Sequence, residues 1–426
     1  MRIQAVLAEP ALSGFYRDDQ PAIRAGAAHD GFLYRGPPVT EGFTAVREAG
    51  AAVTVMLVLE GGQVAVGDCA EVQYSGAGGR APVLSVERAV AEVRDHLAPF
   101  LIGRAVNPFR PLAEEVDRIA VGGRPLLTPV RYGISQALLH AAALATGITM
   151  AELLQQEYDT GMDLARVPVY AQTGDERRIN VDKMILKEVD VLPHGLINQV
   201  DTKLGQDGRV LLDYVTWLRE RILSVRRHEG YTPRLHIDTY GTIGIAFGGN
   251  VPAIAEYLGT LAAAAAPFRL RIEHPVDAGS RDGQVAAFVA LRQILIRRGI
   301  DVELVVDEWC NTLDDIDVFV AARAADVVHV KMPDLGGVTN TVEALLMVRR
   351  SGLAAYCGGS CNETDVSARV SAHIAMACSA NQILAKPGMG VDEGLMIVAN
   401  EMTRTLALVR SRTLNGPAAA TAGAAA

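Results

Sequence analysis

The sequence predicts an α/β protein in which a TIM-type (β/α) barrel follows a smaller α+β domain, and three observations support this fold class. From Val167 onward, short runs of β-branched residues alternate with amphipathic segments, the pattern of parallel strands joined by helices. Eight such runs fit into that part of the chain, and an eight-stranded barrel typically takes about 250 residues. The 426 residues, half of them hydrophobic, suffice for this barrel and a second domain.

The eight expected strands define where a site would lie. They are placed at residues 167–171, 184–186, 234–238, 270–273, 302–307, 327–331, 354–357 and 382–386. Because the chemistry of such barrels takes place at the carboxyl ends of the strands, polar residues that end these runs are candidate site residues. The barrel domain is predicted at residues 161–413. The Ala-rich segment 414–426 lacks residues that could pack, and we expect a disordered tail there.

Residues 1–160 predict an N-terminal α+β capping domain. Its expected elements are strands at 51–59 and 63–66 and helices at 85–101 and 130–146. The two strands are separated by Gly61 and Gly62, which is a hairpin signal. Thr149 and Glu152 have the spacing of a capping box, so another helix is expected to begin at Thr149.

Composition and charge limit the partners and the compartment that we expect. The net charge of -9 comes without a basic block, so neither a nucleic acid nor an anionic membrane surface is expected as a partner. No run reaches the roughly 18 uncharged apolar residues of a membrane-spanning helix, and the N-terminus lacks a signal-peptide pattern. We therefore expect a cytoplasmic protein. The five cysteines include no C-x-x-C pair, which argues against a disulfide framework and a structural zinc site.

Three acidic residues end three successive expected strands. Asp238, Glu273 and Asp307 close the runs LHID, LRIE and LVVD, about one strand–helix unit apart. One acid at a strand end is more often a helix cap or a hydrogen-bond acceptor in a loop, but three at this period converge on one rim of the barrel. Carboxylate oxygens are the ligands that Mg²⁺ prefers. The spacing therefore predicts a site for a hard divalent cation.

Two basic residues share one face of the next strand, and a third lies elsewhere on the rim. Lys331 ends the run VVHVK, and His329 precedes it by two residues, so both side chains should point into the barrel mouth. A lysine near a cation and partly removed from water should have a lowered pKa, which suits a general base. The alternative is a structural ion pair with one of the carboxylates. His194, just beyond the second expected strand, is either a loop residue or a second base.

These residue types fit the removal of a proton next to a carboxylate. Such a proton is very weakly acidic, so the developing enediolate has to be neutralised, and Mg²⁺ offers several kcal/mol of such stabilisation. Bases on opposite sides of the substrate plane would remove either of two epimeric protons. This chemistry alone does not name a substrate.

Several long strings of the sequence, spread over residues 1–413, carry a family resemblance. They are HDGF (29–32), GDCAEVQYSGAGGR (67–80), VRYGISQALL (130–139), VDKMILKEVDVLPH (181–194), LHIDTYGTIG (235–244), VDEWCNT (306–312), KMPDLGG (331–337), GGSCNET (358–364) and KPGMGVDEG (386–394). Through them the chain resembles the methylaspartate ammonia-lyase family of the enolase superfamily. The resemblance implies a TIM-type (β/α) barrel with an N-terminal α+β capping domain.

The resemblance also implies roles for individual residues. The metal ligands of the family fall on Asp238, Glu273 and Asp307, and its two bases fall on Lys331 and His194, as in the independent interpretation. The remaining implied positions, all substrate contacts, are Gln73, Gln172, His329, Ser360, Cys361 through its backbone N–H, and Leu384 in an alkyl pocket. Two positions depart from the family pattern: a glutamine that binds the substrate carboxylate is replaced by His329, and a threonine by Ser360.

The function implied by the resemblance is Mg²⁺-dependent, reversible elimination of ammonia from L-threo-3-methylaspartate to give mesaconate. It also implies a homodimer that acts on a small amino-diacid, with a monovalent cation such as K⁺ as a candidate activator. Two alternatives stay open. One is another enolase-superfamily reaction of a carboxylate, such as racemisation, dehydration or cycloisomerisation. The other is a catalytically silent barrel that acts as an interaction protein.

Overall fold

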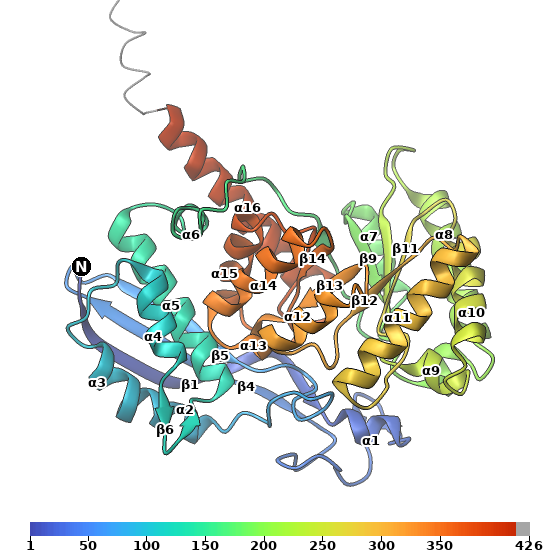
Figure 1. Cartoon of the computed structure of the whole chain (residues 1–426), viewed down its shortest axis with the longest axis horizontal. Coiled ribbons are helices and arrows are strands. Elements are labelled where there is room, and N and C mark those ends of the chain that lie inside the picture. Colours follow the sequence, from blue (N-terminus) through green and yellow to red (C-terminus); the bar gives the residue numbers. More distant parts are fainter. Residues whose placement is uncertain (415–426) are drawn as a thin grey trace, which may run out of the picture.

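In the computed structural model, which describes residues 1–414, an N-terminal α+β domain lies beside a closed barrel (Figure 1). The N-terminal sheet is antiparallel, with the order β1 (Ile3–Asp18), β4 (Arg47–Leu59) and β5 (Val64–Ala70). Around it lie α1 (Gln20–Arg24), β2 (His29–Asp30), β3 (Leu33–Tyr34), α2 (Val86–Glu92), η1 (Val93–Leu97), α3 (Ala98–Leu101), α4 (Phe109–Asp117), β6 (Ala120–Val121), β7 (Arg124–Pro125), α5 (Thr128–Thr146) and α6 (Met150–Tyr158).

Helix α5 packs closely on strand β5 because two glycines face each other there. A Cβ atom on Gly67 would lie 2.2 Å from the carbonyl oxygen of Gly133, and one on Gly133 would lie 2.5 Å from the amide nitrogen of Cys69. Neither position can therefore hold a larger residue without moving the helix away from the sheet. This contact fixes the end of β5, from which the chain runs on toward the barrel mouth.

The predicted elements of the N-terminal region are largely confirmed. The hairpin is β4–β5, the helix expected at 130–146 is α5, and the Thr149–Glu152 capping box begins α6. The segment 85–101 is helical but divided into α2, η1 and α3. Strand β1 was not predicted, because Pro10 and Gly14 interrupt its sequence and one of its faces is partly exposed.

The C-terminal region forms a closed barrel of eight parallel strands. Their order around the barrel is β10 (Arg234–Asp238), β11 (Leu270–Glu273), β12 (Val302–Val306), β13 (Val327–Val330), β14 (Ala354–Cys357), β15 (Gln382–Leu384), β8 (Val169–Tyr170) and β9 (Val191–His194). The helices are α7 (Ile179–Leu186), η2 (Val200–Leu204), α8 (Arg209–Val225), α9 (Thr242–Ala246), α10 (Val251–Ala265), α11 (Arg281–Arg298), α12 (Leu313–Ala321), α13 (Met332–Leu335), α14 (Val338–Arg350), α15 (Asp365–Ala377) and α16 (Val391–Leu414). The tail segment 415–426 lies outside the described residues.

One predicted strand is wrong. Residues 184–186 lie in helix α7, and the second barrel strand is β9. In the helix, Val181, Met184 and Ile185 are buried while Leu186 is exposed, which is helical spacing that a three-residue window cannot distinguish from a strand. The other seven strands lie within or at the predicted ranges and are in several cases one to three residues shorter.

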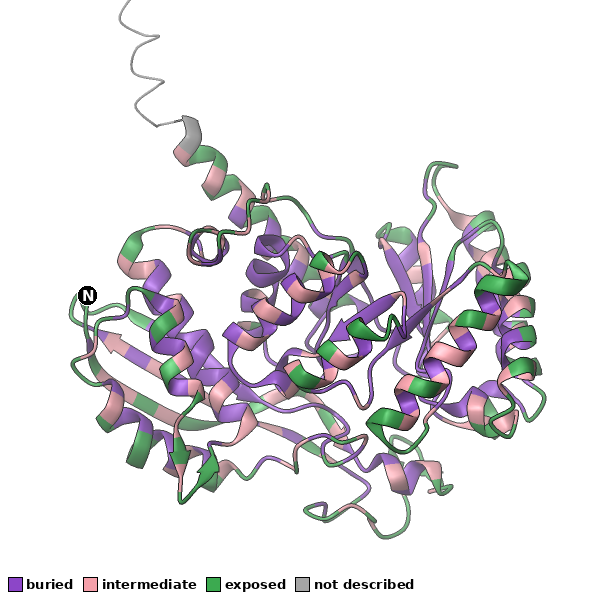
Figure 2. Ribbon diagram, viewed as in Figure 1, coloured by how far each residue is buried: buried purple, intermediate pink, exposed green. Residues whose placement is uncertain are grey.

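Burial follows the two layers of the barrel. Figure 2 shows the strands as buried and the outward faces of the surrounding helices as exposed. The five cysteines are buried free thiols, as expected of a chain without a disulfide framework. Within residues 1–414, no single helix is long and apolar enough to cross a membrane; α5 and α6 pass that test only as a pair bent by 95°.

Candidate active site

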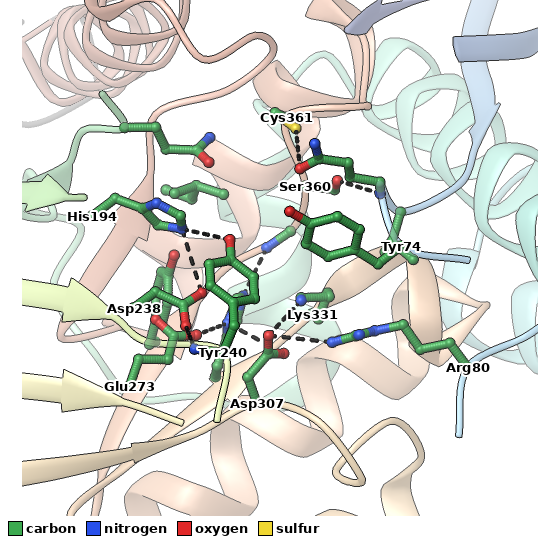
Figure 3. Close-up of a pocket in the computed structure, with 17 residues that line it drawn as sticks. Tyr74, Arg80, His194, Asp238, Tyr240, Glu273, Asp307, Lys331, Ser360 and Cys361 are labelled. Atoms are coloured by element: carbon green, nitrogen blue, oxygen red, sulfur yellow. Dashed lines mark hydrogen bonds and ion pairs between the residues drawn. The ribbon is translucent and has the colours of Figure 1, made fainter. Parts of the chain in front are cut away.

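All the predicted site residues line one pocket at the carboxyl ends of the barrel strands (Figure 3). The pocket contains Gln73, Gln172, His194, Asp238, Glu273, Asp307, His329, Lys331, Ser360, Cys361 and Leu384. Gln73 comes from the N-terminal domain, just after β5, and the others come from the barrel. The two domains therefore share this site.

The three carboxylates lie on neighbouring strands. Asp238 and Glu273 are paired in register as the last residues of β10 and β11, and Asp307 directly follows β12. All three are buried, and Oδ1 of Asp307 has no hydrogen-bond partner among the described residues. Ligand atoms of Glu273, Asp307 and His329 lie within 4.8 Å of one another. The close group thus contains two of the three carboxylates with His329, and Asp238 lies on the neighbouring strand end; buried carboxylates gathered in this way suit a hard divalent cation.

Burial and mutual repulsion set the charge of these acids. Burial, followed by the nearby charge of Asp238, raises the pKa of Glu273 to about 7, although a hydrogen bond from His329 acts in the opposite direction. For Asp307, burial is the largest influence and favours the neutral acid, but Lys331, His329 and Arg80 together outweigh it and lower the pKa. The site therefore gathers several carboxylates, and the nearby cationic side chains offset only part of their negative charge.

Lys331 forms an ion pair with a carboxylate of the site. Its Nζ lies 2.6 Å from Oδ2 of Asp307. Removal from water and the nearby Arg80 both favour a lower pKa, yet Asp307, Glu308 and Asp334 outweigh them and raise the pKa of Lys331. The predicted lowering applies beside a bound cation; without that cation, the three acids, which that prediction did not count, keep the pKa of Lys331 raised.

His194 lies on the opposite wall from Lys331. It ends β9, and Lys331 follows β13; these strands are four steps apart in a barrel of eight. Its Nε2 lies 3.3 Å from the hydroxyl of Tyr240 and 3.5 Å from Oδ2 of Asp238. The buried Nδ1 has no hydrogen-bond partner among the described residues. His194 therefore contacts pocket residues through Nε2 and keeps one ring nitrogen without a hydrogen bond to the described residues.

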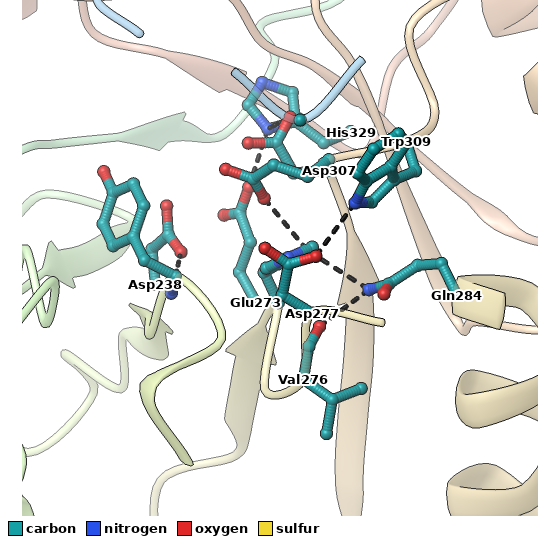
Figure 4. Close-up of polar contacts among 12 residues, drawn as sticks. Asp238, Glu273, Val276, Asp277, Gln284, Asp307, Trp309 and His329 are labelled. Atoms are coloured by element: carbon teal, nitrogen blue, oxygen red, sulfur yellow. Dashed lines mark hydrogen bonds and ion pairs between the residues drawn. The ribbon is translucent and has the colours of Figure 1, made fainter. Parts of the chain in front are cut away.

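His329 is held between a tyrosine ring and backbone. Its ring stacks on Tyr356 with centroids 4.1 Å apart, and its Nε2 accepts a 3.2 Å hydrogen bond from the N–H of Gly359. Figure 4 shows the other edge of the ring facing two acids: Nδ1 lies 2.7 Å from Oε1 of Glu273 and 3.5 Å from Oδ1 of Asp307. The imidazole therefore contacts the carboxylate cluster directly.

The remaining predicted residues form the rest of the pocket wall. Gln73 donates from Nε2 to Asp18 (2.9 Å), and its Oε1 accepts from the thiol of Cys361 (3.3 Å). The hydroxyl of Ser360 accepts from the backbone N–H of Gln73 at 2.9 Å. Leu384 belongs to an apolar cluster inside the barrel, together with Tyr170 and Tyr356. The wall thus combines amide, hydroxyl and alkyl groups.

Sequence reasoning missed a cation that joins the two domains. Arg80 is buried, and its guanidinium lies 3.2 Å from Asp307, 3.5 Å from Glu308 and 3.1 Å from Asp334. Tyr74 and Tyr240 also line the pocket without having been predicted. Arg80 ends the string GDCAEVQYSGAGGR, and Glu308 follows Asp307 directly, so both could have been identified as charged neighbours of the site.

The glycines after Gln73 allow the N-terminal loop to lie on the barrel. The carbonyl of Gly78 accepts hydrogen bonds from the backbone of Trp309 (3.1 Å) and the side chain of Asn311 (2.8 Å). A Cβ atom on Gly78 would lie 2.8 Å from Cγ of Glu308, and one on Gly79 would lie 3.2 Å from the Trp309 ring. Positive φ angles and these short approaches explain the two glycines.

Comparisons with known proteins agree with this geometry. The sequence matches the families described as Methylaspartate ammonia-lyase N-terminus over residues 1–159 and Methylaspartate ammonia-lyase C-terminus over residues 161–411. Methylaspartate ammonia-lyase from Clostridium tetanomorphum is 55% identical over 412 residues, covering 97% of this chain and 100% of that protein.

Solved structures give the same result. The Mg complex of beta-methylaspartase from Clostridium tetanomorphum superposes with a TM-score of 0.91, covering 97% of this chain and 100% of that one, at 55% identity. The Citrobacter amalonaticus enzyme containing (2S,3S)-3-methylaspartic acid has a TM-score of 0.94, with 50% identity, 96% of this chain and 100% of that one. Muconate lactonizing enzyme from Pseudomonas putida, at 17% identity, covers 88% of this chain and 85% of its own, and its TM-score of 0.58 supports the barrel fold alone. This chain belongs to the methylaspartate ammonia-lyase family, whose members are carbon–nitrogen lyases.

Proposed function

We propose that this protein catalyses the reversible elimination of ammonia from L-threo-3-methylaspartate to give mesaconate, with Mg²⁺ as its cofactor. The observation that carries the proposal is the placement of two candidate bases, Lys331 and His194, on opposite walls of a mouth that holds three carboxylates. The Clostridium relative is a Mg complex, and the Citrobacter relative contains 3-methylaspartic acid. These relatives are 55% and 50% identical to the chain, which supports transfer of the reaction.

Asp238, Glu273 and Asp307 are the proposed metal ligands. They come from adjacent strand ends, ligand atoms of Glu273 and Asp307 lie within 4.8 Å of each other, and Oδ1 of Asp307 accepts no hydrogen bond from the described residues. When bound, Mg²⁺ supplies positive charge that neutralises these carboxylates and stabilises the negative charge that develops on the substrate carboxylate. Pairing with a cation would compensate the cost of burying three carboxylates in one site.

Lys331 is the proposed base for the L-threo substrate. Without a bound cation, Lys331 is an ammonium paired with Asp307, 2.6 Å away. When that carboxylate is neutralised by bound Mg²⁺, the neutral amine is favoured; it takes the proton from C3 and becomes an ammonium beside Asp307, Glu308 and Asp334 again. The same acids that raise its pKa therefore stabilise the product of the proton transfer. Loss of the C3 proton then allows the C2–N bond to break, and ammonia leaves as mesaconate forms.

His194 is the proposed base on the other face. Its unpaired Nδ1 and the Tyr240 contact of Nε2 fit an imidazole that takes a proton into the pocket, from the epimer whose C3 hydrogen points toward β9. On this view the enzyme handles L-erythro-3-methylaspartate mainly through His194.

The other pocket residues are proposed to bind the substrate. Gln73, Gln172, Ser360 and Cys361 offer amide, hydroxyl and backbone groups to the carboxylate and amino groups of an amino-diacid. Leu384 lies with aromatic rings and suits the methyl group at C3. A hydrophobic contact for one methyl group and several polar contacts for the two charged ends fit a small substituted aspartate.

A direct assay tests the proposal. Purified protein with L-threo-3-methylaspartate and Mg²⁺ should release ammonia and mesaconate in equal amounts, and mesaconate with ammonia should be converted back. Chiral analysis of the remaining substrate detects the alternative, because epimerisation without ammonia would assign another enolase-superfamily reaction. A metal-loaded protein that changes no substrate would instead support the silent barrel.

Organisation and environment are proposed along with the activity. The capping domain is placed at 1–160 and the barrel domain at 161–413, in agreement with family matches that meet between residues 159 and 161. A homodimer located in the cytoplasm, with K⁺ as a candidate activator, completes the proposal. Light scattering of the purified protein tests the dimer, and initial rates with and without K⁺ test the activator.

A further inference from the structure

A column of polar side chains runs through the barrel interior below the site. It consists of Glu303, Arg271, Gln382 and His236, and it leads to Glu273. Barrel interiors are usually filled by branched apolar side chains, and a buried polar group costs free energy unless it is paired. Arg271, Gln382 and His236 are all buried. We therefore ask which side chain these buried polar groups hold in position.

The contacts in the column determine which ring nitrogen of His236 carries the proton. Nη1 of Arg271 donates to Oε1 of Gln382 at 2.7 Å, and Arg271 has no acceptor group, so the amide of Gln382 can have only one orientation. Nε2 of Gln382 therefore donates to Nδ1 of His236, 2.9 Å away. A neutral His236 must then carry its proton on Nε2. That nitrogen lies 2.9 Å from Oε2 of Glu273.

The tautomer of His329 is determined in the same way from the other side. The backbone N–H of Gly359 donates to its Nε2 at 3.2 Å, so the proton of the neutral ring is on Nδ1. Nδ1 lies 2.7 Å from Oε1 of Glu273. A Cβ atom on Gly358 would lie 1.8 Å from Nε2 of His329, so the ring position requires glycine there. Tyr356 covers the ring face.

We propose that His236 and His329 are positioning residues for Glu273: the N–H of His329 holds Oε1, and Nε2 of His236 lies 2.9 Å from Oε2, where a small rotation of the carboxylate would let it donate to that oxygen. Their tautomers are set by groups that can only donate: Arg271, acting through Gln382, for His236 and the backbone N–H of Gly359 at the pocket wall for His329. This inference rests on the proposed function, in which Glu273 is a metal ligand. It adds that the ligand is oriented before the cation binds.

The arrangement has a clear consequence for metal binding. Each carboxylate oxygen has about two lone-pair sites, so one N–H per oxygen leaves one site on each for a cation. Partners that orient a ligand typically change metal affinity by about 10- to 100-fold when they are removed. The N–H of His236 is not yet aligned with Oε2 well enough for a hydrogen bond, and rotation of the Glu273 carboxylate changes that angle.

Mn²⁺ binding to variants of the full chain tests the inference without relying on activity. Gln382→Met keeps the volume of the side chain and removes both hydrogen bonds of the column. We expect it to weaken Mn²⁺ binding about tenfold, measured by the electron paramagnetic resonance signal of free Mn²⁺. The matched control is Gln136→Met, which removes another buried glutamine, bonded to the backbone of Asp68 far along the chain in the N-terminal domain. It should bind Mn²⁺ like the parent protein.

A ligand variant separates the two levels of the proposal. Asp238→Asn should weaken Mn²⁺ binding strongly. If it does, while Gln382→Met binds Mn²⁺ as tightly as the parent, the positioning role is overturned and the metal site stands. If Asp238→Asn also binds normally, the metal site itself is wrong.

Tautomers can be measured in the parent protein, which keeps the inference testable should Gln382→Met fail to fold. In protein labelled with ¹⁵N-histidine, neutral tautomers have distinct ring nitrogen shifts, and loss of signals in His329→Gln and His236→Gln assigns the two rings. We expect His329 to be protonated on Nδ1 and His236 on Nε2 at pH 8. The opposite tautomer at either ring overturns the inference.

Discussion

Two glutamates in this molecule each face an imidazole, yet their pKa values move in opposite directions. Glu273 in the barrel mouth is 2.7 Å from His329, and Glu401 on α16 is 3.2 Å from His373. The pKa of Glu273 is raised to about 7 by burial and by Asp238, whereas Glu401, although burial opposes it, has its pKa lowered to about 2 by His373 and two arginines.

The difference lies in the surroundings rather than in the partner. Glu401 has Arg369 and Arg404 within 3.1 Å and keeps some exposure, so its charge stabilises the fold. Glu273 is buried near two acids, Asp238 and Asp307. Among the described residues, its side-chain partners are the imidazoles of His236 and His329 rather than arginines. The charge of Glu401 therefore stabilises the packing of helix α16. The charge of Glu273 in the barrel mouth lowers the stability of the protein until a cation binds. The following predictions test this contrast.

The largest expected contrast is in catalysis. Lys331→Ala removes the cationic partner of Asp307 in the mouth, and Arg369→Ala removes a cationic partner of Glu401 on α16. Lys331→Ala should lower turnover of L-threo-3-methylaspartate by about 10³-fold or more, because general base catalysis contributes 10²–10⁴-fold. Arg369→Ala should keep its activity. Exchange of the C3 hydrogen in deuterated water, followed by NMR, measures the step directly; undiminished exchange in Lys331→Ala would mean that another residue is the base.

The second prediction concerns the stability of the mouth. Above pH 7 and in the presence of a chelator, Glu273→Gln should be more stable than the parent. We expect its free energy of unfolding to be higher by on the order of 2–3 kcal/mol, which raises the unfolding temperature. The folded pKa of Glu273 is raised above the unfolded value, so stability is present below about 4.5 and is lost as pH rises through 7. The advantage of Glu273→Gln should thus grow between pH 5 and 8. A variant less stable than the parent across this range would contradict the cost assigned to Glu273.

The third prediction is the reverse for the outer helix. Glu401→Gln should reduce stability at pH 7 by about 1 kcal/mol, allowing for its partial exposure. Because the folded pKa of Glu401 is lowered, its contribution is present above about 4.5 and disappears as pH falls toward 2. Thermal unfolding of parent and variant between pH 3 and 7 measures this, with turnover as the control that should not change. A stability difference independent of pH would show that the carboxylate acts through packing instead.

The sequence predicts the mouth well because its residues end recognisable strands. Asp238 and Glu273 follow apolar runs, and the strings of the family resemblance assign Gln73 and Ser360, which lie far apart along the chain. The wrong strand at 184–186 arose because a short apolar run has no distinct period. The sequence could have revealed more: the two-residue rule that pairs His329 with Lys331 also pairs His236 with Asp238.

Cross-barrel contacts could not be predicted. Gln382 begins β15 and Arg271 lies on β11, and nothing in either local sequence indicates that their side chains meet inside the barrel. The same holds for Arg80, which reaches three acids from another domain. Partners of this kind depend on closure of the barrel and on domain packing rather than on a period along one strand.

The smallest expected effect is that of replacing His329 by the glutamine of the family pattern. With the tautomer proposed above, His329 donates to Glu273 across 2.7 Å, so a glutamine amide can take over as donor at a similar reach. His329→Gln should therefore keep kcat/KM for 3-methylaspartate within about tenfold, or about 1.4 kcal/mol, of the parent. His329→Ala should lose more, since it leaves Oε1 of Glu273 without a donor and removes the ring that stacks on Tyr356.

His373→Gln is the matched control, because it alters the imidazole beside Glu401 and should affect stability but not kcat/KM. Measuring kcat/KM against pH for the four proteins decides the role of His329. If His329→Gln is as inactive as Lys331→Ala, His329 takes part in proton transfer, and the contrast between a positioning imidazole in the mouth and a stabilising one on the helix fails.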